Sequence, residues 1–208
     1  MSALVALAVP VGEIASQARS RSNMRSISNA AAWTKATADR VTLSAADAQS
    51  AAVAGFLPRD TRSVLNIDRP LRYGEYEWND RAVPAGQVVV AVDLRSQMIS
   101  VFRAGHEIGT AVILYGADDH ETPIGTYPVR SKDRVHQSVA YDALMPFTLW
   151  LTPDGVAIHG SDVRGGHATH GCIGVPIKFA ELLFRVVQVG DPVVVVRSLP
   201  PGSRAANG

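Results

Sequence analysis

The chain has 208 residues, of which 47% are apolar and 19% charged, with a formal net charge of +1. These proportions are typical of a globular protein of one or two domains and unlike those of a disordered chain. A net charge this small gives no general case for nucleic-acid binding, so no nucleic-acid partner is predicted. No run approaches the roughly 20 apolar residues that a membrane-spanning helix needs, so no stable membrane span is expected.

The first eleven residues are apolar and have about the length of the hydrophobic part of an export signal. Ser16-Gln17-Ala18 fits the small-x-small pattern of a cleavage site, although no basic residue precedes Leu4. We therefore interpret residues 1–18 as a candidate export signal. The alternative is an apolar N-terminal strand or helix that packs on the domain.

Residues 19–83 are expected to form a basic and weakly structured region with one or two helices at most. Between Arg19 and Arg62, seven basic residues stand against three acidic ones. A solvated tail explains this imbalance better than contact with an anionic surface. A short helix is expected to begin after Ser44, because a serine hydroxyl can accept an amide hydrogen of the first helical turn.

From Val88 onward, β-branched runs separated by turn residues predict a mainly β domain of residues 84–198. Asp93-Leu94-Arg95-Ser96 is expected to form a hairpin turn, and Pro153-Asp154-Gly155 a second turn. Apolar residues at helical spacing predict one helix over residues 176–189, ended by Gly190. Residues 199–208 are expected to form a flexible tail. The expected strands cover residues 88–93, 98–103, 106–115, 122–129, 147–152, 155–159 and 193–196.

Cys172 is the only cysteine of the chain, so it has no partner for a disulfide within the chain. It lies among glycines and histidines, in Ala168-Thr169-His170-Gly171-Cys172-Ile173, downstream of Ile158-His159-Gly160. A free thiol is only a few per cent ionised at neutral pH, so a catalytic cysteine needs a neighbouring base or cation. His159 and His170 are the nearest candidates, and we assign His159 as the base. Because glycine permits close backbone approach, the amides of Gly171 and Cys172 could face a developing oxyanion.

These two segments resemble the signature of the L,D-transpeptidase catalytic domain, also called the YkuD domain. The strand at 88–93 followed by Gln97, the turn at 121–125 and Met145-Pro146-Phe147 resemble this family as well. The resemblance covers about residues 84–198. It implies a β-sandwich or barrel of mixed sheets with one helix in the C-terminal half. It also implies a cysteine-dependent acyltransferase without cofactor or metal, in the periplasm or cell wall. The sequence does not define the oligomeric state, and a monomer is expected.

The resemblance also implies residue roles and a substrate. Cys172 matches the nucleophile, His159 the general base, and Gly160 the residue whose carbonyl orients that histidine. The substrate would be peptidoglycan stem peptides, cut after meso-diaminopimelate. The acyl group would pass to an amine, forming a 3–3 crosslink or attaching a protein, in cell-wall biogenesis and cell shape. The family's stretch that shapes the oxyanion and substrate pocket is matched here by Thr169, His170 and Gly171.

Two features depart from the family pattern, and several other interpretations stay open. Gly174 stands where many members have arginine, and the short loop before Cys172 carries an extra His167. Transfer to water would make the protein an L,D-carboxypeptidase or hydrolase, and Gly174 would also fit a wall-binding module without turnover. Cys172 could be a buried structural thiol. It could also share a zinc ion with His159, His167 and His170. The remaining histidines are interpreted as surface or strand-end residues: His106, His120 and His136.

Overall fold

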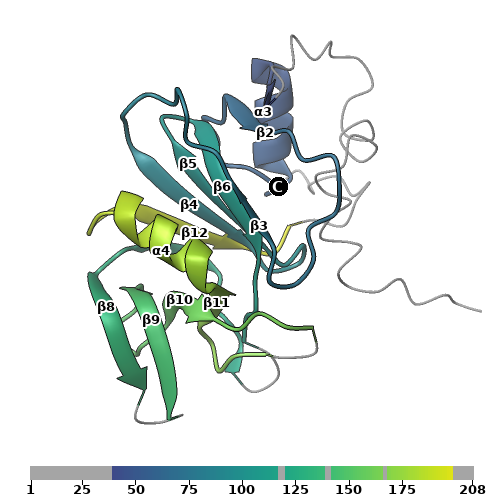
Figure 1. The fold of residues 1–208 in the computed structure, drawn as a ribbon. Helices are drawn as coiled ribbons and strands as arrows, with labels where there is room; N and C mark the ends of the chain where they lie inside the picture. The colour runs from purple at the N-terminus through teal and green to yellow at the C-terminus, as the bar shows by residue number, and fades with distance from the viewer. Residues whose placement is uncertain (1–38, 117–119, 139–141, 166–167, 199–208) are drawn as a thin grey trace, which may run out of the picture.

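The computed structural model describes residues 39–116, 120–138, 142–165 and 168–198, and it shows two β-sheets with a helix between them (Figure 1). Residues 1–38 and 199–208, which include the predicted export signal and the predicted tail, lie outside the described residues. The larger sheet has eight strands and the smaller one has four. Each sheet contains parallel and antiparallel pairs. The prediction of a mainly β fold with mixed sheets is confirmed.

The strand order defines both sheets. The larger sheet runs β1 (Arg40–Thr42), β2 (Ser63–Leu65), β6 (His106–Val112), β5 (Met98–Arg103), β4 (Val88–Asp93), β12 (Pro192–Val196) and β7 (Gly125–Pro128). A further strand, β3 (Tyr76–Trp78), pairs with β6. The smaller sheet runs β11 (Ile173–Pro176), β10 (Ala157–Ser161), β9 (Ala143–Trp150) and β8 (Ser131–Ser138).

Helix α4 (Ile177–Val186) supplies much of the core between the two sheets. Phe179 and Leu183, four residues apart on one helical face, are fully or almost fully buried. The ring of Phe179 meets that of Trp78 edge to face, with centroids 5.6 Å apart. Against this face pack buried aliphatic residues of both sheets, among them Val90, Ile99, Leu149, Ile158, Ile173 and Val175. The apolar periodicity thus predicted the correct buried face.

Several element bounds differ from those expected. Helix α4 ends three residues early, because Val187 is already extended. Strand β9 begins at Ala143 and pairs with β8, which the sequence did not predict. Strand β8 is mostly polar because it lies at the edge of the smaller sheet, where solvent reaches much of it. The hairpin of β4 and β5 is confirmed, and the Asp93 carboxylate accepts hydrogen bonds from the Arg95 amide and the Ser96 hydroxyl.

The described part of the N-terminal region, residues 39–83, is more regular than its composition indicated. It contains β1, β2, β3 and helix α3 (Ala45–Val53), which is capped by Ser44 as expected. Glu107 of β6, fully buried, accepts the Leu65 amide hydrogen at 2.9 Å. Arg40 donates to the Glu107 carbonyl at 2.6 Å. These bonds join β1 and β2 to the larger sheet, so the packed core extends well upstream of residue 84.

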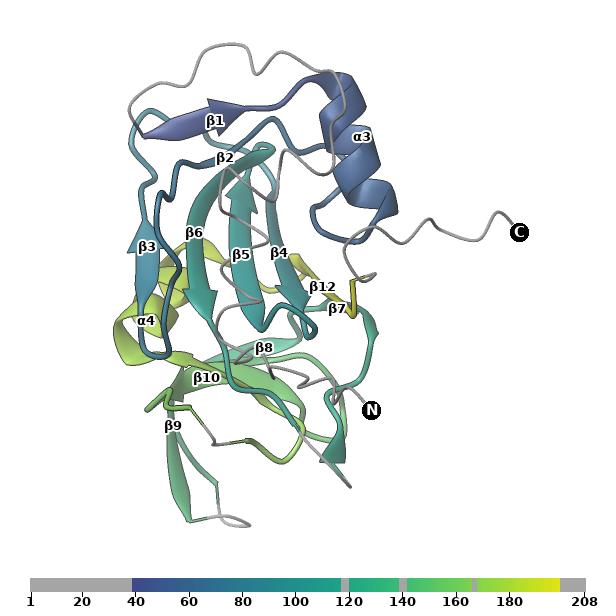
Figure 2. The same cartoon turned by 90° about the vertical axis from the view of Figure 1, so that its right-hand side faces the viewer.

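Helices α3 and α4 lie on opposite faces of the larger sheet (Figures 1 and 2). Helix α4 covers the face toward the smaller sheet, and α3 lies on the other face. Among the described residues, neither helix has the length and apolar character required to cross a bilayer.

Candidate active site

The candidate site lies where the smaller sheet meets the continuation of β6. Strands β10 and β11 are parallel, with Ile158 opposite Ile173 and His159 opposite Gly174. One residue further back, this register places Ala157 opposite Cys172. Cys172 directly precedes β11, and its thiol contacts the backbone of Gly155 and Ala157, at the start of the strand that carries His159. The fold thus brings the two predicted catalytic residues together from segments 13 residues apart in sequence.

His159 is held in one tautomer by its own strand. The Nδ1–H group donates to the carbonyl oxygen of Gly160 at 3.0 Å, which leaves Nε2 of the neutral ring as an acceptor. Burial lowers the pKa of His159 below its ordinary value of 6.5. The Gly160 carbonyl opposes this shift, and the charge of His136 adds to it. The imidazole is therefore neutral at neutral pH and able to accept a proton.

Gly160 is also required by packing. A Cβ atom at this position would lie 3.0 Å from Cγ of Pro146 and 3.2 Å from the Pro146 carbonyl oxygen. Pro146 belongs to the neighbouring strand β9, so any side chain at position 160 would push the two segments apart. The carbonyl that orients His159 thus belongs to Gly160, whose lack of a side chain lets its backbone pack closely against Pro146.

Cys172 is half-buried and belongs to none of the hydrophobic clusters of the described residues. Its thiol donates to the Gly155 carbonyl, with 3.7 Å between Sγ and the oxygen. Burial raises the pKa of Cys172, and a hydrogen bond from the Ala157 backbone partly opposes that shift. The thiol is therefore protonated at rest, and its sulfur points toward Gly155 rather than toward the imidazole.

The turn before Cys172 is fixed by hydrogen bonds to the segment that follows β6. Gly171 has a φ of +99°, a conformation that favours glycine. Its carbonyl accepts the Thr122 hydroxyl at 2.9 Å, and the same hydroxyl accepts the Gly116 amide hydrogen at 2.9 Å. Within the described ranges, the amides of Gly171 and Cys172 have no main-chain hydrogen-bond partner. Both N–H groups therefore remain available as donors there.

The other two residues of the predicted pocket stretch have different surroundings. The Thr169 hydroxyl donates to the Cys172 carbonyl, and the Thr169 amide donates to the Tyr115 carbonyl at 3.1 Å. Thr169 thus supports the backbone of the nucleophile candidate. His170 is exposed, and its ring lies edge to face against that of His120, with centroids 5.5 Å apart. Both histidines are surface groups beside the turn.

The structure gives a physical reason for Gly174. A Cβ atom there would lie 3.1 Å from Cβ and 3.4 Å from Oγ of Ser161, and 3.5 Å from Cβ of Leu114. Leu114 and Gly174 also exchange two backbone hydrogen bonds of 2.9 Å, which connect the continuation of β6 to β11. Ser161 therefore fills the space into which a side chain at position 174 would begin.

This geometry can be compared with two of the alternative interpretations, a buried structural thiol and a zinc site. A sealed structural thiol does not fit Cys172, which is partly accessible and borders a turn rather than a core cluster. In the described part of the chain, no three His, Cys, Asp or Glu side chains are grouped so that they could hold a metal ion. His167, one of the four residues of the zinc interpretation, lies outside the described residues.

Sequence reasoning gave no role to Thr122, although the turn at 121–125 was part of the family resemblance. His136 was interpreted as a surface or strand-end residue without a role in the site. His136 lies near the end of β8, where its ring meets the Trp150 ring edge to face at 4.9 Å and its charge acts on His159. The Trp150 Nε1–H donates to Asp133 at 2.7 Å. Trp150 lies opposite Ala157 in the smaller sheet, so this group borders the candidate site.

Comparison with known proteins agrees with this fold and motif. The family model of the YkuD L,D-transpeptidase catalytic domain matches residues 87–195, and the chain belongs to this family. Two curated relatives are from Mycobacterium tuberculosis. L,D-transpeptidase 1 is 26% identical over 129 residues, covering 53% of this chain and 51% of the relative. Probable L,D-transpeptidase 3 is 26% identical over 106 residues, covering 43% and 39%. The matches thus span about half or less of each relative.

A solved structure shows the same fold. The L,D-transpeptidase from Stackebrandtia nassauensis has a TM-score of 0.51 and 22% sequence identity, and the match covers 57% of this chain and 59% of that one. At this identity, the likeness establishes the arrangement of the sheets and not the details of the chemistry.

Proposed function

We propose that the protein is a peptidoglycan L,D-transpeptidase in which Cys172 is the nucleophile and His159 the general base. The observation that carries this proposal is the parallel pairing of β10 with β11, in which the strand that bears His159 lies beside the strand that Cys172 directly precedes. Family membership supports the reaction class. The tautomer of His159 supports its role, because the Gly160 carbonyl holds the proton at Nδ1 and leaves Nε2 as an acceptor.

The reaction begins from the neutral pair. Rotation about χ1 of Cys172 moves the sulfur from the Gly155 carbonyl toward Nε2 of His159. The thiol proton passes to Nε2 as the sulfur attacks the carbonyl carbon of meso-diaminopimelate, the third residue of a stem tetrapeptide. The resulting oxyanion accepts hydrogen bonds from the amides of Gly171 and Cys172, and one well-placed donor is worth about 3–4 kcal/mol.

The second half of the reaction restores the enzyme. The imidazolium of His159 gives its proton to the nitrogen of the departing D-amino acid, and a thioester remains on Cys172. An amine of a second stem peptide then attacks the thioester and loses a proton to His159. The thiol of Cys172 is reformed as the new amide bond is made. Attack by water would release a tripeptide instead.

The raised pKa of Cys172 and the lowered pKa of His159 fit this order of reaction steps. A base that is neutral at rest can accept the thiol proton only as attack proceeds, so the charge pair forms next to the substrate. A substrate in the peptidoglycan layer places the protein outside the cytoplasm. We therefore propose the periplasm or cell wall as its location and residues 84–198 as its catalytic domain.

The test is incubation of the full chain with disaccharide-tetrapeptides, followed by mass analysis of the products. Crosslinked dimers identify an amine acceptor, and tripeptides identify water. Cys172→Ala is expected to keep its fold, measured by circular dichroism, and to lose both products. Dimers formed by Cys172→Ala would show that another residue is the nucleophile.

A matched pair of histidine variants tests the base. His159→Gln is expected to lose product formation, whereas His106→Gln is expected to keep it. His106 lies at the far end of β6 and binds Ser63 at 2.9 Å. Equal activity of the two variants would contradict the role of His159.

A further inference from the structure

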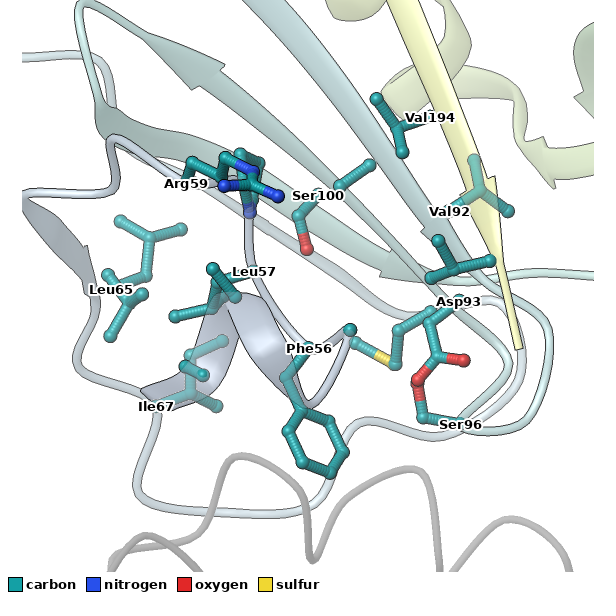
Figure 3. Close-up of a pocket in the computed structure, with 18 of the residues that line it drawn as sticks. Phe56, Leu57, Arg59, Leu65, Ile67, Val92, Asp93, Ser96, Ser100 and Val194 are labelled. Atoms are coloured by element: carbon teal, nitrogen blue, oxygen red, sulfur yellow. The ribbon is translucent and has the colours of Figure 1, made fainter. Parts of the chain in front are cut away.

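A cavity of about 410 Å³ lies on the face of the larger sheet that carries α3 (Figure 3). None of its lining residues belongs to the Cys172 site. Its floor is a row of small and medium side chains on four paired strands. Thr126 lies opposite Val194, Val194 opposite Ala91, and Ala91 opposite Ser100.

Larger residues flank this row on the same strands, so the floor is recessed. On β5, Phe102 and Met98 lie two positions to either side of Ser100 and point to the same face. The opposite wall is also built from small residues at its helical end, since α3 contributes Ala51 and Ala52. Small side chains on both facing layers leave a hollow where close packing would otherwise fill the space.

The rest of the cavity wall is apolar. It comes from the segment after α3, from β2 and from the residues that follow β2, including Phe56, Leu57, Pro58, Val64, Leu65 and Ile67. Cavities of 300–1,000 Å³ with mostly apolar walls and a few polar groups are typical of small-molecule sites. Both the size and the lining therefore favour an aliphatic ligand.

Two charged residues border the cavity, and only one of them is available. The Asp93 carboxylate is satisfied by the Ser96 hydroxyl at 2.7 Å and by the amides of Arg95 and Ser198 at 3.0 Å each. The Arg59 side chain makes no hydrogen bond and no ion pair with any residue in the described ranges. Figure 3 shows Arg59 at the side of Ser100, and Asp93 with Ser96 at the opposite side.

We propose that this cavity binds an anionic amphiphile, an aliphatic chain with a carboxylate or phosphate head. The chain lies on the recessed floor against Phe56, Leu57 and Met98. The head group pairs with the Arg59 guanidinium, whose planar donors match a carboxylate or a phosphate. Asp93 disfavours a second anion at the other side, which fixes the direction of the ligand. This site is independent of the reaction proposed for Cys172.

The test is calorimetric titration of the full chain with three probes of equal chain length, each below its micelle concentration. The probes are decanoate, decyl phosphate and decyltrimethylammonium. Saturable binding of one molecule per chain is expected for one or both anions, at least about tenfold tighter than for the cation. Preference between the two anions distinguishes a free carboxylic acid from a lipid phosphate.

Variants separate the head group from the cavity. Arg59→Ala is expected to weaken anion binding about tenfold, the effect of losing a charge-assisted hydrogen bond. Arg59→Glu is expected to reverse the preference toward the cation. The matched control, Arg81→Ala, removes an exposed arginine outside the cavity and should leave binding unchanged. Ala91→Leu fills the floor and is expected to abolish binding while the unfolding midpoint is kept or raised.

Three outcomes would overturn the proposal. One is the absence of saturable binding by either anion. Another is equal affinity for anions and cation, and a third is equal effects of Arg59→Ala and Arg81→Ala. If another part of the chain filled the cavity, no probe would bind and Ala91→Leu would lower the unfolding midpoint, which also refutes the proposal.

Discussion

The turn before Cys172 depends on one side-chain group, the hydroxyl of Thr122. It accepts the Gly116 amide hydrogen and donates to the Gly171 carbonyl, both at 2.9 Å, and Thr122 is only 3% exposed. Thr122→Val keeps the shape of the side chain and removes both bonds. We expect it to loosen the backbone that aims the Gly171 and Cys172 amides.

The expected loss of unfolding free energy comes from the two backbone groups that lose their hydrogen-bond partner. Gly116 and Gly171 are both buried, so their freed N–H and carbonyl groups cannot be fully hydrated. A buried polar group without a partner costs roughly 1–3 kcal/mol, so two cost about 2–4 kcal/mol after partial relaxation. Misdirection of an oxyanion donor should also slow acylation by at least about tenfold.

Thr110→Val is the matched control. Thr110 is fully buried, but its hydroxyl makes one bond, to the Ile99 carbonyl at 2.9 Å in the middle of the larger sheet. We expect a loss of about 1–2 kcal/mol and no change in acylation. Urea unfolding measures the free energy of both variants, and the rate of Cys172 labelling by a carbapenem measures acylation. If Thr122→Val matched Thr110→Val in both measurements, the proposed support of the turn would be refuted.

Two further predictions follow from the electrostatics and from α4. The kcat/KM of transpeptidation should fall at acid pH as His159 is protonated, with the midpoint below 6.5 because burial lowers the pKa of His159. His136→Gln removes a charge that lowers this pKa, so the midpoint should move to higher pH; a shift to lower pH would contradict this. Lys132 donates to two carbonyls at the end of α4 at 2.6 Å each and lies 4.3 Å from an aromatic ring centroid. Lys132→Met should therefore cost about 1–3 kcal/mol of unfolding free energy. Lys178→Met, which removes only an exposed ion pair, should cost less than about 0.5 kcal/mol; equal losses in urea unfolding would refute the assigned role.

Local chemistry explains the parts of the fold that the sequence predicted well. The hairpin at Asp93 depends on bonds to residues two and three positions away, and the cap at Ser44 on a bond three positions away. Strand β8 escaped prediction because an edge strand needs little apolar periodicity. The catalytic roles of Cys172 and His159 rest on the motif and on strand pairing, and they stay predictions until product analysis tests them.

The family motif, the single thiol, the main hairpin and the buried face of the last helix could all be predicted from the sequence. Which distant groups meet could be seen only in the folded structure. Thr122 reaches Gly171 across 49 positions, and Arg40 reaches Glu107 across 67. The direction of the pKa shifts of Cys172 and His159 also depends on the folded structure, since both shifts come mainly from burial. Periodicity and turn chemistry act within a few residues, whereas burial and long-range pairing exist only once the whole chain has packed.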